Sequence, residues 1–217
     1  MRLRIRTHGA DDYAAVAAAV GRWGQQVCDL GAASRLTLAT YFPEVGRYGS
    51  GPVMEAAEAV FAADSHAVAL AARLLTPQVI HPQALAAIGM VNIADGFHHD
   101  RERSTEWLLA HLAAKVAPSA DRGVADHAAS WATTGTLPNG APLPSPLAEA
   151  WQARRGALHR YRGALESDTD SDRVLPALLH MHHNRVRLID RADETVCLRL
   201  ARQIALARQA RATRRST

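Results

Sequence analysis

From Pro52 to its end the sequence has the spacing and composition of a helical protein, and this constrains the fold more than any other feature. Pro52 suits the first turn of a long helix that runs to Leu75. Alanine-rich segments with helical periodicity predict further helices over 81–94, 101–115, 121–131 and 147–165, and from about Leu175. Arg191 to about Arg211 either continues this last helix or starts another. The stretch from Thr133 to Pro146 is rich in proline and glycine, which predicts a surface loop.

The region before Pro52 has a different pattern. The opening RLRIR alternates, so that Arg2, Arg4 and Arg6 point to one side of a predicted half-buried strand. A helix is predicted over 11–31, and the β-branched and aromatic residues of 35–42 predict a second strand. The expected fold class is therefore α+β, with a small N-terminal antiparallel sheet and a predominantly helical body.

Composition excludes several classes of protein. Hydrophobic residues make up 48% of the chain, which predicts a folded protein. The net charge is +4, but the arginines do not alternate with aromatic residues as a surface for single-stranded nucleic acid requires, so no direct nucleic-acid partner is expected. The sequence has neither a signal peptide nor a long apolar stretch. We therefore expect a cytoplasmic location and no contact with a membrane. Cys28 and Cys197 match no metal or redox spacing.

Two segments that contain arginine are candidates for binding an anion. The first strand presents Arg2 and Arg4 on one face, which is either an anion site or a solvated strand edge. In PEVGRYGSGP, Glu44 and Arg47 lie in a glycine-rich segment just before a helix start, where backbone N–H groups favour an anion. A connecting loop whose glycines serve only tight turns is the alternative.

Most of the titratable chemistry lies in LLHMHHNRVRLIDRADE, residues 178–194. On a helix His180, His183 and Asn184 share one face, and His182 points elsewhere. His180 is interpreted as a general acid or base because histidine titrates near neutrality, and histidines that only pack at a helix crossing are the alternative. No metal is expected, since the carboxylates that follow lie too far along the same helix to join His180. These carboxylates belong to Asp190, Asp193 and Glu194.

Three segments resemble the C-terminal domain of lantibiotic dehydratases, also called the thiopeptide-type bacteriocin biosynthesis domain. They are TLATYFPEVGRYGSGPVMEAAEAVFAADSHAV, AWQARRGALHRYR and LLHMHHNRVRLIDRADE, and the resemblance runs from Arg2 to about Ala207. In that family a partner protein or domain uses glutamyl-tRNA to glutamylate Ser or Thr of a ribosomal precursor peptide. The domain then eliminates glutamate and leaves dehydroalanine or dehydrobutyrine, and no cofactor is implied.

The resemblance also implies roles for individual residues. Matched to the family's motifs, the catalytic residues are His180, Arg47, Glu44 and Arg4. The residues implied to bind the substrate are Arg2, Arg4, Arg47 and Asn184. In this assignment the arginines stabilise the carboxylate of the leaving glutamate, and His180 takes the Cα proton.

The chain departs from the family in two places. The family has several dozen residues before the arginine strand, so residues 1–217 are expected to form one elimination-like domain that lacks the family's N-terminal strands. Three alternatives would explain the missing strands: the chain is truncated, its start codon is misassigned, or another subunit completes the sheet. An unpartnered strand is expected to recruit a partner or a second copy of the chain. The second departure is Leu188, which stands where the family motif has glycine.

Two other functions are compatible with the resemblance. Relatives in thiopeptide pathways catalyse a formal [4+2] cycloaddition between two dehydroalanines. A non-catalytic subunit that binds the peptide is the third reading. The retained arginines, Glu44 and His180 favour elimination, because a cycloaddition has no glutamate to bind.

Overall fold

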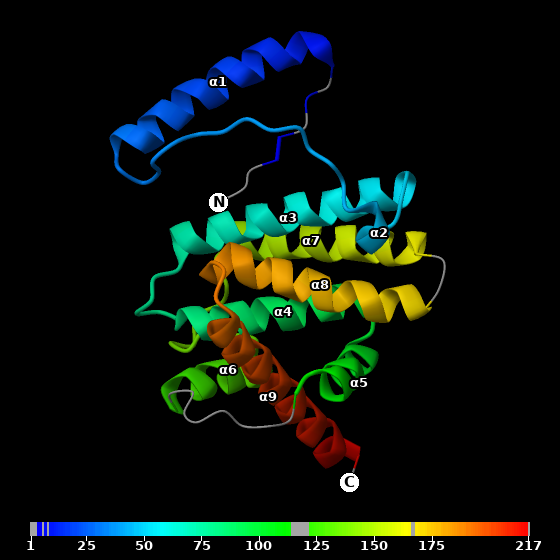
Figure 1. Cartoon of the computed structure of the whole chain (residues 1–217). Coiled ribbons are helices and arrows are strands. Elements are labelled where there is room, and N and C mark those ends of the chain that lie inside the picture. Colours follow the sequence, from blue (N-terminus) through cyan, green and yellow to red (C-terminus); the bar gives the residue numbers. More distant parts are fainter. Residues whose placement is uncertain (1–3, 6, 8, 114–121, 166–167, 217) are drawn as a thin grey trace. The chain divides into compact units, whose positions relative to one another are not determined.

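The computed structural model describes residues 4–5, 7, 9–113, 122–165 and 168–216. The chain divides into two compact units, Met1–Pro43 and Glu44–Thr217. Within the described ranges all regular secondary structure is helical (Figure 1). None of these helices is long and apolar enough to cross a membrane.

The first unit consists of helix α1, Ala10–Asp29, and an extended segment that follows it. The segment lies against the helix at Gly24, where an added Cβ would stand 2.5 Å from Cδ2 of Leu36. Many of its large apolar side chains are exposed, including Trp23, Leu38 and Phe42. A unit this small cannot bury most of its apolar surface by itself.

The predicted α+β fold with an N-terminal antiparallel sheet is wrong, because no described residue lies in a β-strand. Residues 35–42 are extended, as their β-branched and aromatic composition predicts, and so are Arg4 and Ile5. Extended backbone becomes a sheet only when N–H and C=O groups pair with a neighbouring strand in register. Neither segment has such a ladder in the part of the chain that the structure describes. Arg2 and Arg6 lie outside the described residues.

The second unit is a helical bundle that begins with the single turn α2, Val45–Tyr48. Helix α3, Pro52–Leu74, packs along α7, Ser145–Ala164. Helix α4, Pro82–His98, lies next to α8, Asp168–Arg187 (Figure 1). The remaining helices are α5 (Arg101–His111), α6 (Arg122–Thr134) and α9 (Arg191–Ser216). Most of the predicted helices are present. Their ends differ from the predictions by a few residues, except that α8 begins at Asp168 and not near Leu175.

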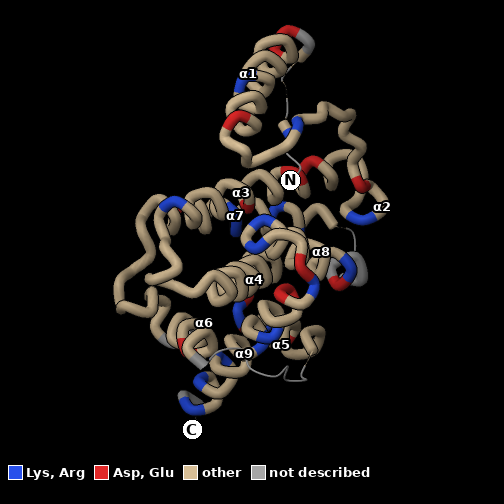
Figure 2. Tube along the Cα trace, turned by 60° about the vertical axis from the view of Figure 1, so that its left-hand side comes forward, with Lys and Arg blue, Asp and Glu red and all other residues tan. Residues whose placement is uncertain are grey.

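Helix α4 is the centre of the core. It contacts α5, α6, α7, α8 and α9, and most of its side chains are buried. The helix is apolar on all sides, as its sequence AAIGMVNIA requires for a position with neighbours all round. Asp95 is the one acidic residue of α4, and both basic and acidic residues lie near α8 (Figure 2).

One buried carboxylate joins three helices of this bundle, and its partner Arg154 extends the network to a fourth. Oδ1 of Asp64 on α3 accepts from Nη1 of Arg154 at 2.7 Å and from Nδ1 of His182 at 2.8 Å. Oδ2 of Asp64 accepts from Nη1 of Arg185 at 2.9 Å. Nη2 of Arg154 donates to Oδ1 of Asn92 on α4 at 2.8 Å. Burial opposes ionisation of Asp64, but His182 and the two arginines outweigh it, so the pKa of Asp64 is lowered.

The chain reverses between α8 and α9. Leu188 ends α8 with φ 71°, in the left-handed region that helix stops usually fill with glycine. Asp190 then caps α9, where its Oδ1 accepts from the backbone N–H of Ala192 at 2.8 Å and of Asp193 at 3.1 Å. The first turn of α9 is thereby brought back toward α8, which places Asp193 and Glu194 beside the histidines of that helix.

Candidate functional site

His180 is held between two side chains at the surface of α8. Its Nδ1 lies 2.7 Å from Oε1 of Glu194, and its Nε2 lies 3.0 Å from Nδ2 of Asn184. The side chain of His180 is 43% exposed, whereas that of Glu194 is 16% exposed. The imidazole is therefore open to a ligand, while the carboxylate that orients it is largely covered.

These contacts define the tautomer of His180. Asn184 presents its amide nitrogen, a donor, so Nε2 accepts and Nδ1 carries the hydrogen that is donated to Glu194. Nε2 is then the basic atom. Its lone pair is engaged by Asn184, so a substrate proton reaches Nε2 only when that amide moves aside. The Oδ1 atom of Asn184 is buried without a hydrogen-bond partner among the described residues.

The neighbouring histidine on the same face of α8 is fixed more tightly. His183 is fully buried, and its Nε2 lies 2.9 Å from Oδ2 of Asp193. Arg187 donates to both oxygens of Asp193, at 3.0 and 3.1 Å, and Gln83 Nε2 donates to Oδ1 at 2.7 Å. Burial opposes ionisation of Asp193, but these three donors prevail and lower its pKa.

The sequence argument that the carboxylates of α9 lie too far along to meet the histidines is wrong. It assumed one continuous helix, but the reversal at Leu188 brings Glu194 to His180 and Asp193 to His183. Ligand atoms of His183, Asp193 and Cys197 even lie within 4.8 Å of one another. A cation there would compete with the Arg187 guanidinium for the same carboxylate, and burial raises the pKa of the Cys197 thiol to about 12. We therefore assign this cluster a structural role.

Glu44 and Arg47 lie at the single turn α2. Arg47 Nη1 is 3.3 Å from Oε2 of Glu44, and both side chains are about half exposed, at 53% and 49%. An ion pair this exposed contributes little to stability, roughly 0–1 kcal/mol. Both groups are accessible to a ligand in solution.

Tyr48 anchors α2 next to α8. Its ring is buried and meets Phe61 edge-on, with centroids 4.9 Å apart, and Tyr161 donates to its backbone oxygen at 2.9 Å. The guanidinium of Arg185 lies 5.6 Å from the centroid of the same Phe61 ring. Arg47 thus precedes a residue that is fixed against α3 and α7, and Arg185 of α8, the helix that carries His180, lies against the same Phe61 ring.

Two further predicted residues, Arg4 and Arg2, belong to the first unit. Arg4 is exposed in the first unit, where its guanidinium lies 5.0 Å from the centroid of the Tyr41 ring. Arg2 lies outside the described residues. The expectation that Arg4, Arg47 and His180 line one cavity stays a prediction. The sequence analysis named Glu194 but judged it too far from His180, although Asp193, three residues after the capping Asp190, has the spacing of a helix start.

The comparisons with known proteins agree with these segments. A sequence model described as the C-terminal part of lantibiotic biosynthesis dehydratases matches residues 1–205. The chain belongs to this family. The segments that carry the resemblance, around Arg47, Arg154 and His180, all lie inside the matched range. The comparison with curated proteins gave no match.

A solved structure shows that the family's fold is shared. The chain is similar to the tRNA-dependent lantibiotic dehydratase MibB from Microbispora sp. 107891, with a TM-score of 0.67 and 22% identity. The similarity covers 93% of this chain but only 22% of MibB, so the chain spans about a fifth of the length of that enzyme. This likeness concerns the fold, and it leaves the activity of the chain to be inferred from its own residues.

Proposed function

We propose that this protein eliminates glutamate from glutamylated Ser or Thr of a ribosomal precursor peptide. Membership of the lantibiotic dehydratase C-terminal family and the arrangement of His180 support this proposal together. A half-exposed imidazole that is oriented by a covered carboxylate has the form of a general base. The precursor peptide is the substrate, and a separate protein or domain supplies the glutamyl group.

The proposed reaction balances with one base and one leaving group. Nε2 of His180 takes the Cα proton of the modified residue, and the electron pair of that bond forms the Cα–Cβ double bond. The Cβ–O bond breaks, and glutamate leaves as a carboxylate. Glu194 stabilises the imidazolium through Nδ1, as the carboxylate of a catalytic triad does. Asn184 must release Nε2 first, which a substrate amide that pairs with Asn184 would bring about.

Arg47 is the proposed anion-binding residue of α2. Its guanidinium is already paired with Glu44, but five N–H donors leave several for the leaving carboxylate. A planar fork contacts a carboxylate through two parallel bonds, which an ammonium group cannot do. Arg47→Lys is therefore expected to lower elimination by roughly tenfold or more although the charge is kept. Arg73→Lys, an exposed change on α3, is the matched control.

The direct test uses a synthetic glutamylated precursor peptide and mass spectrometry. The wild-type protein should release glutamate and form dehydrated peptide, and His180→Ala should be slower by about 10²–10⁴-fold. His66→Ala removes an exposed histidine on α3 and should leave the rate unchanged. Unimpaired turnover by a folded His180→Ala variant would remove this residue from the mechanism.

The role of Glu194 is tested separately as that of a positioning residue. Glu194→Gln keeps an oxygen that accepts from Nδ1 but loses the charge, and a charge-assisted bond of about 1.5–3 kcal/mol corresponds to roughly 10–100-fold. We expect this loss in kcat, with KM and the melting temperature close to wild type. Loss of thermal stability with unchanged kcat would instead mean that Glu194 only holds α9 against α8.

The same assay separates the other functions of the family. Consumption of a peptide that already contains dehydroalanines, without use of the glutamylated peptide, would indicate cycloaddition. Binding of the precursor peptide with neither reaction would indicate a non-catalytic subunit. Either outcome would refute the elimination proposal.

A further inference from the structure

A second group of charged side chains surrounds a cavity at the opposite end of α8. The cavity has a volume of about 260 Å³ and is lined by residues of four helices, α4, α5, α7 and α8. Its residue on α8 is Asp172, which precedes His180 by about two helical turns, or about 12 Å along the axis. The cavity is therefore separate from the proposed elimination site.

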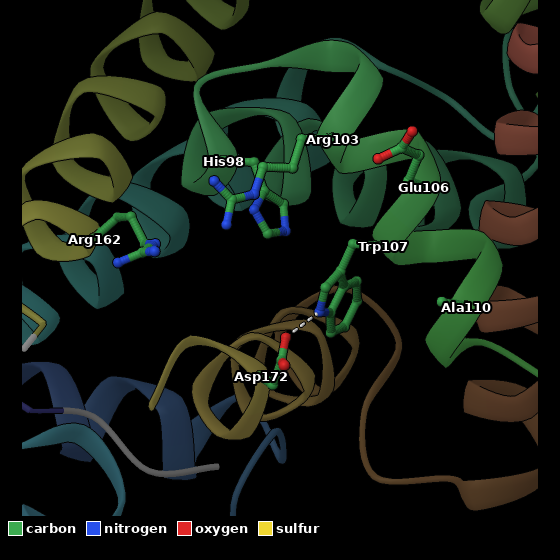
Figure 3. Close-up of a pocket in the computed structure, with 7 residues that line it drawn as sticks. All are labelled: His98, Arg103, Glu106, Trp107, Ala110, Arg162 and Asp172. Carbon is green, nitrogen blue, oxygen red and sulfur yellow. Dashed lines mark hydrogen bonds between the residues drawn. The ribbon is translucent and has the colours of Figure 1, made fainter. Parts of the chain in front are cut away.

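One side of this cavity is basic. Arg103 from α5 and Arg162 from α7 line it together with His98, the last residue of α4, and in Figure 3 the Arg103 side chain lies beside His98. The Arg162 guanidinium is 5.9 Å from the centroid of the buried Phe97 ring, a contact that restrains the long side chain. Each guanidinium has five N–H donors, so it can contact a ligand carboxylate and a neighbour in the protein at the same time.

His98 contributes a neutral imidazole to this basic side. Burial lowers the pKa of His98, and the charges of Arg103 and Arg162 lower it further. Its Nε2 atom is buried and has no hydrogen-bond partner among the described residues. A buried polar atom without a partner is uncommon in proteins, and a ligand or water in the adjoining cavity would satisfy it.

The other side of the cavity is acidic and aromatic. Asp172 accepts from Nε1 of Trp107 at 2.8 Å through Oδ1, which leaves Oδ2 for a ligand (Figure 3). The Trp107 ring stacks on His111 with centroids 4.4 Å apart, so the indole and with it Asp172 are fixed. Glu106, one residue before Trp107, adds a second carboxylate to the lining.

The backbone next to the cavity is strained. His99 connects α4 to α5 with φ 55°, a left-handed conformation that costs about 1–2 kcal/mol in a residue other than glycine. This turn sets the position of His98 on one side and of α5, with Arg103 and Trp107, on the other. Strained residues cluster at ligand sites, because the surrounding structure must hold them in place.

We propose that this cavity binds a free α-amino acid. The carboxylate lies against Arg103, Arg162 and His98, and the ammonium group lies against Asp172 and Glu106, with the side chain along Trp107. Two arginines and two carboxylates give the lining no net charge, which suits a zwitterion better than a simple anion or cation. The volume is below the range of about 300–1,000 Å³ that holds drug-sized ligands, as expected for so small a molecule.

The test is an NMR titration that follows the indole N–H of Trp107, which is bonded directly to Asp172. L-norvaline carries both charged groups, pentanoate lacks the ammonium group, and butylamine lacks the carboxylate. L-norvaline should shift the signal saturably, and each of the two analogues should bind at least roughly tenfold more weakly, because a hydrogen bond to a charged group is worth about 1.5–3 kcal/mol.

Two substitutions locate the ligand. Arg162→Gln removes the guanidinium charge, and Asp172→Asn removes the carboxylate charge but keeps the oxygen that accepts from Trp107. Each should weaken L-norvaline by roughly tenfold or more at an unchanged melting temperature. Arg173→Gln, an exposed change at the next position of α8, should bind as wild type does.

The proposal fails if L-norvaline produces no saturable shift, or if both charge variants bind it normally. Equal binding of pentanoate would make this a simple anion site, and equal binding of butylamine a cation site; both results would refute the amino-acid assignment. The proposed elimination is tested independently by His180→Ala. That variant should lose elimination and still bind L-norvaline, so failure of one proposal leaves the other intact.

Discussion

The left-handed residue at the end of α8 offers a test of the chain reversal that forms the candidate site. Leu188 has φ 71° and is 76% exposed, so its side chain contributes little to packing while its backbone is strained. Leu188→Gly should remove the strain, which is about 1–2 kcal/mol for a left-handed residue with a Cβ.

Two smaller terms oppose this gain. Glycine has more freedom in the unfolded chain, which lowers stability by about 0.5–1 kcal/mol. The remaining quarter of burial corresponds to less than about 1 kcal/mol, since full burial of a leucine is worth roughly 1.5–3 kcal/mol. The net change is therefore small, and a matched control is needed to isolate the strain.

Ile189→Gly is that control. Ile189 is the next residue in the same turn, is 85% exposed and has no positive φ, so glycine there carries both penalties and relieves no strain. Leu188→Gly should therefore be more stable than Ile189→Gly by about 1–2 kcal/mol. In a unit of this size that corresponds to about 2–8 °C in melting temperature. Equal stability of the two variants in urea and thermal unfolding would show that the turn is not strained.

Two further substitutions test the buried part of the bundle. Gly89→Ala should lower the free energy of unfolding by about 1–3 kcal/mol in urea unfolding, because the new Cβ would stand 2.1 Å from Nε2 of His182, which is buried and cannot move away. The control is Gly156→Ala on α7, where the new Cβ would make an ordinary contact. In the same assay this control should raise the free energy of unfolding by up to about 1 kcal/mol. Asp64→Asn should cost about 3–5 kcal/mol at neutral pH because it leaves Arg154 without its buried partner. The pKa of Asp64 is lowered in the folded protein, so the stability that this group contributes is present above the ordinary aspartate pKa of about 3.9 and is lost as pH falls. Between pH 7 and pH 3 the free energy of unfolding in urea should therefore depend less steeply on pH in Asp64→Asn than in the wild type. An unchanged slope would contradict this linkage.

The helices could be predicted from the sequence because their signals are local. Pro52 begins α3, Asp100 caps α5 through the N–H of Glu102 at 2.8 Å, and the apolar periodicity covers α4 on all sides. The sheet could not be predicted in the same way. Alternation in RLRIR and the residues of 35–42 report only that the backbone is extended, and whether a ladder forms depends on partners that the pattern does not identify.

The candidate site was predicted in part. His180 and Asn184 share a face of α8 as their spacing requires, and His182 points elsewhere, toward Asp64. Glu194 was excluded because it was placed on the same helix as His180. A leucine at position 188 gives no sequence signal that the helix ends there, although its backbone adopts the left-handed conformation that favours glycine. The cavity at Trp107 was missed for another reason: its residues come from four helices, and their convergence is a property of packing that no single segment encodes.

Asp193 and Glu194 are consecutive residues in the first turn of α9, and each pairs with a different histidine of α8. The buried pair of Asp193 with His183 therefore fixes the register at which the exposed pair of Glu194 with His180 can form. Any change that slides or rotates the start of α9 must disturb both contacts at once. The reactive imidazole at the surface and the stable helix crossing beneath it consequently depend on the same short turn. Substitutions in this turn should therefore change both properties together.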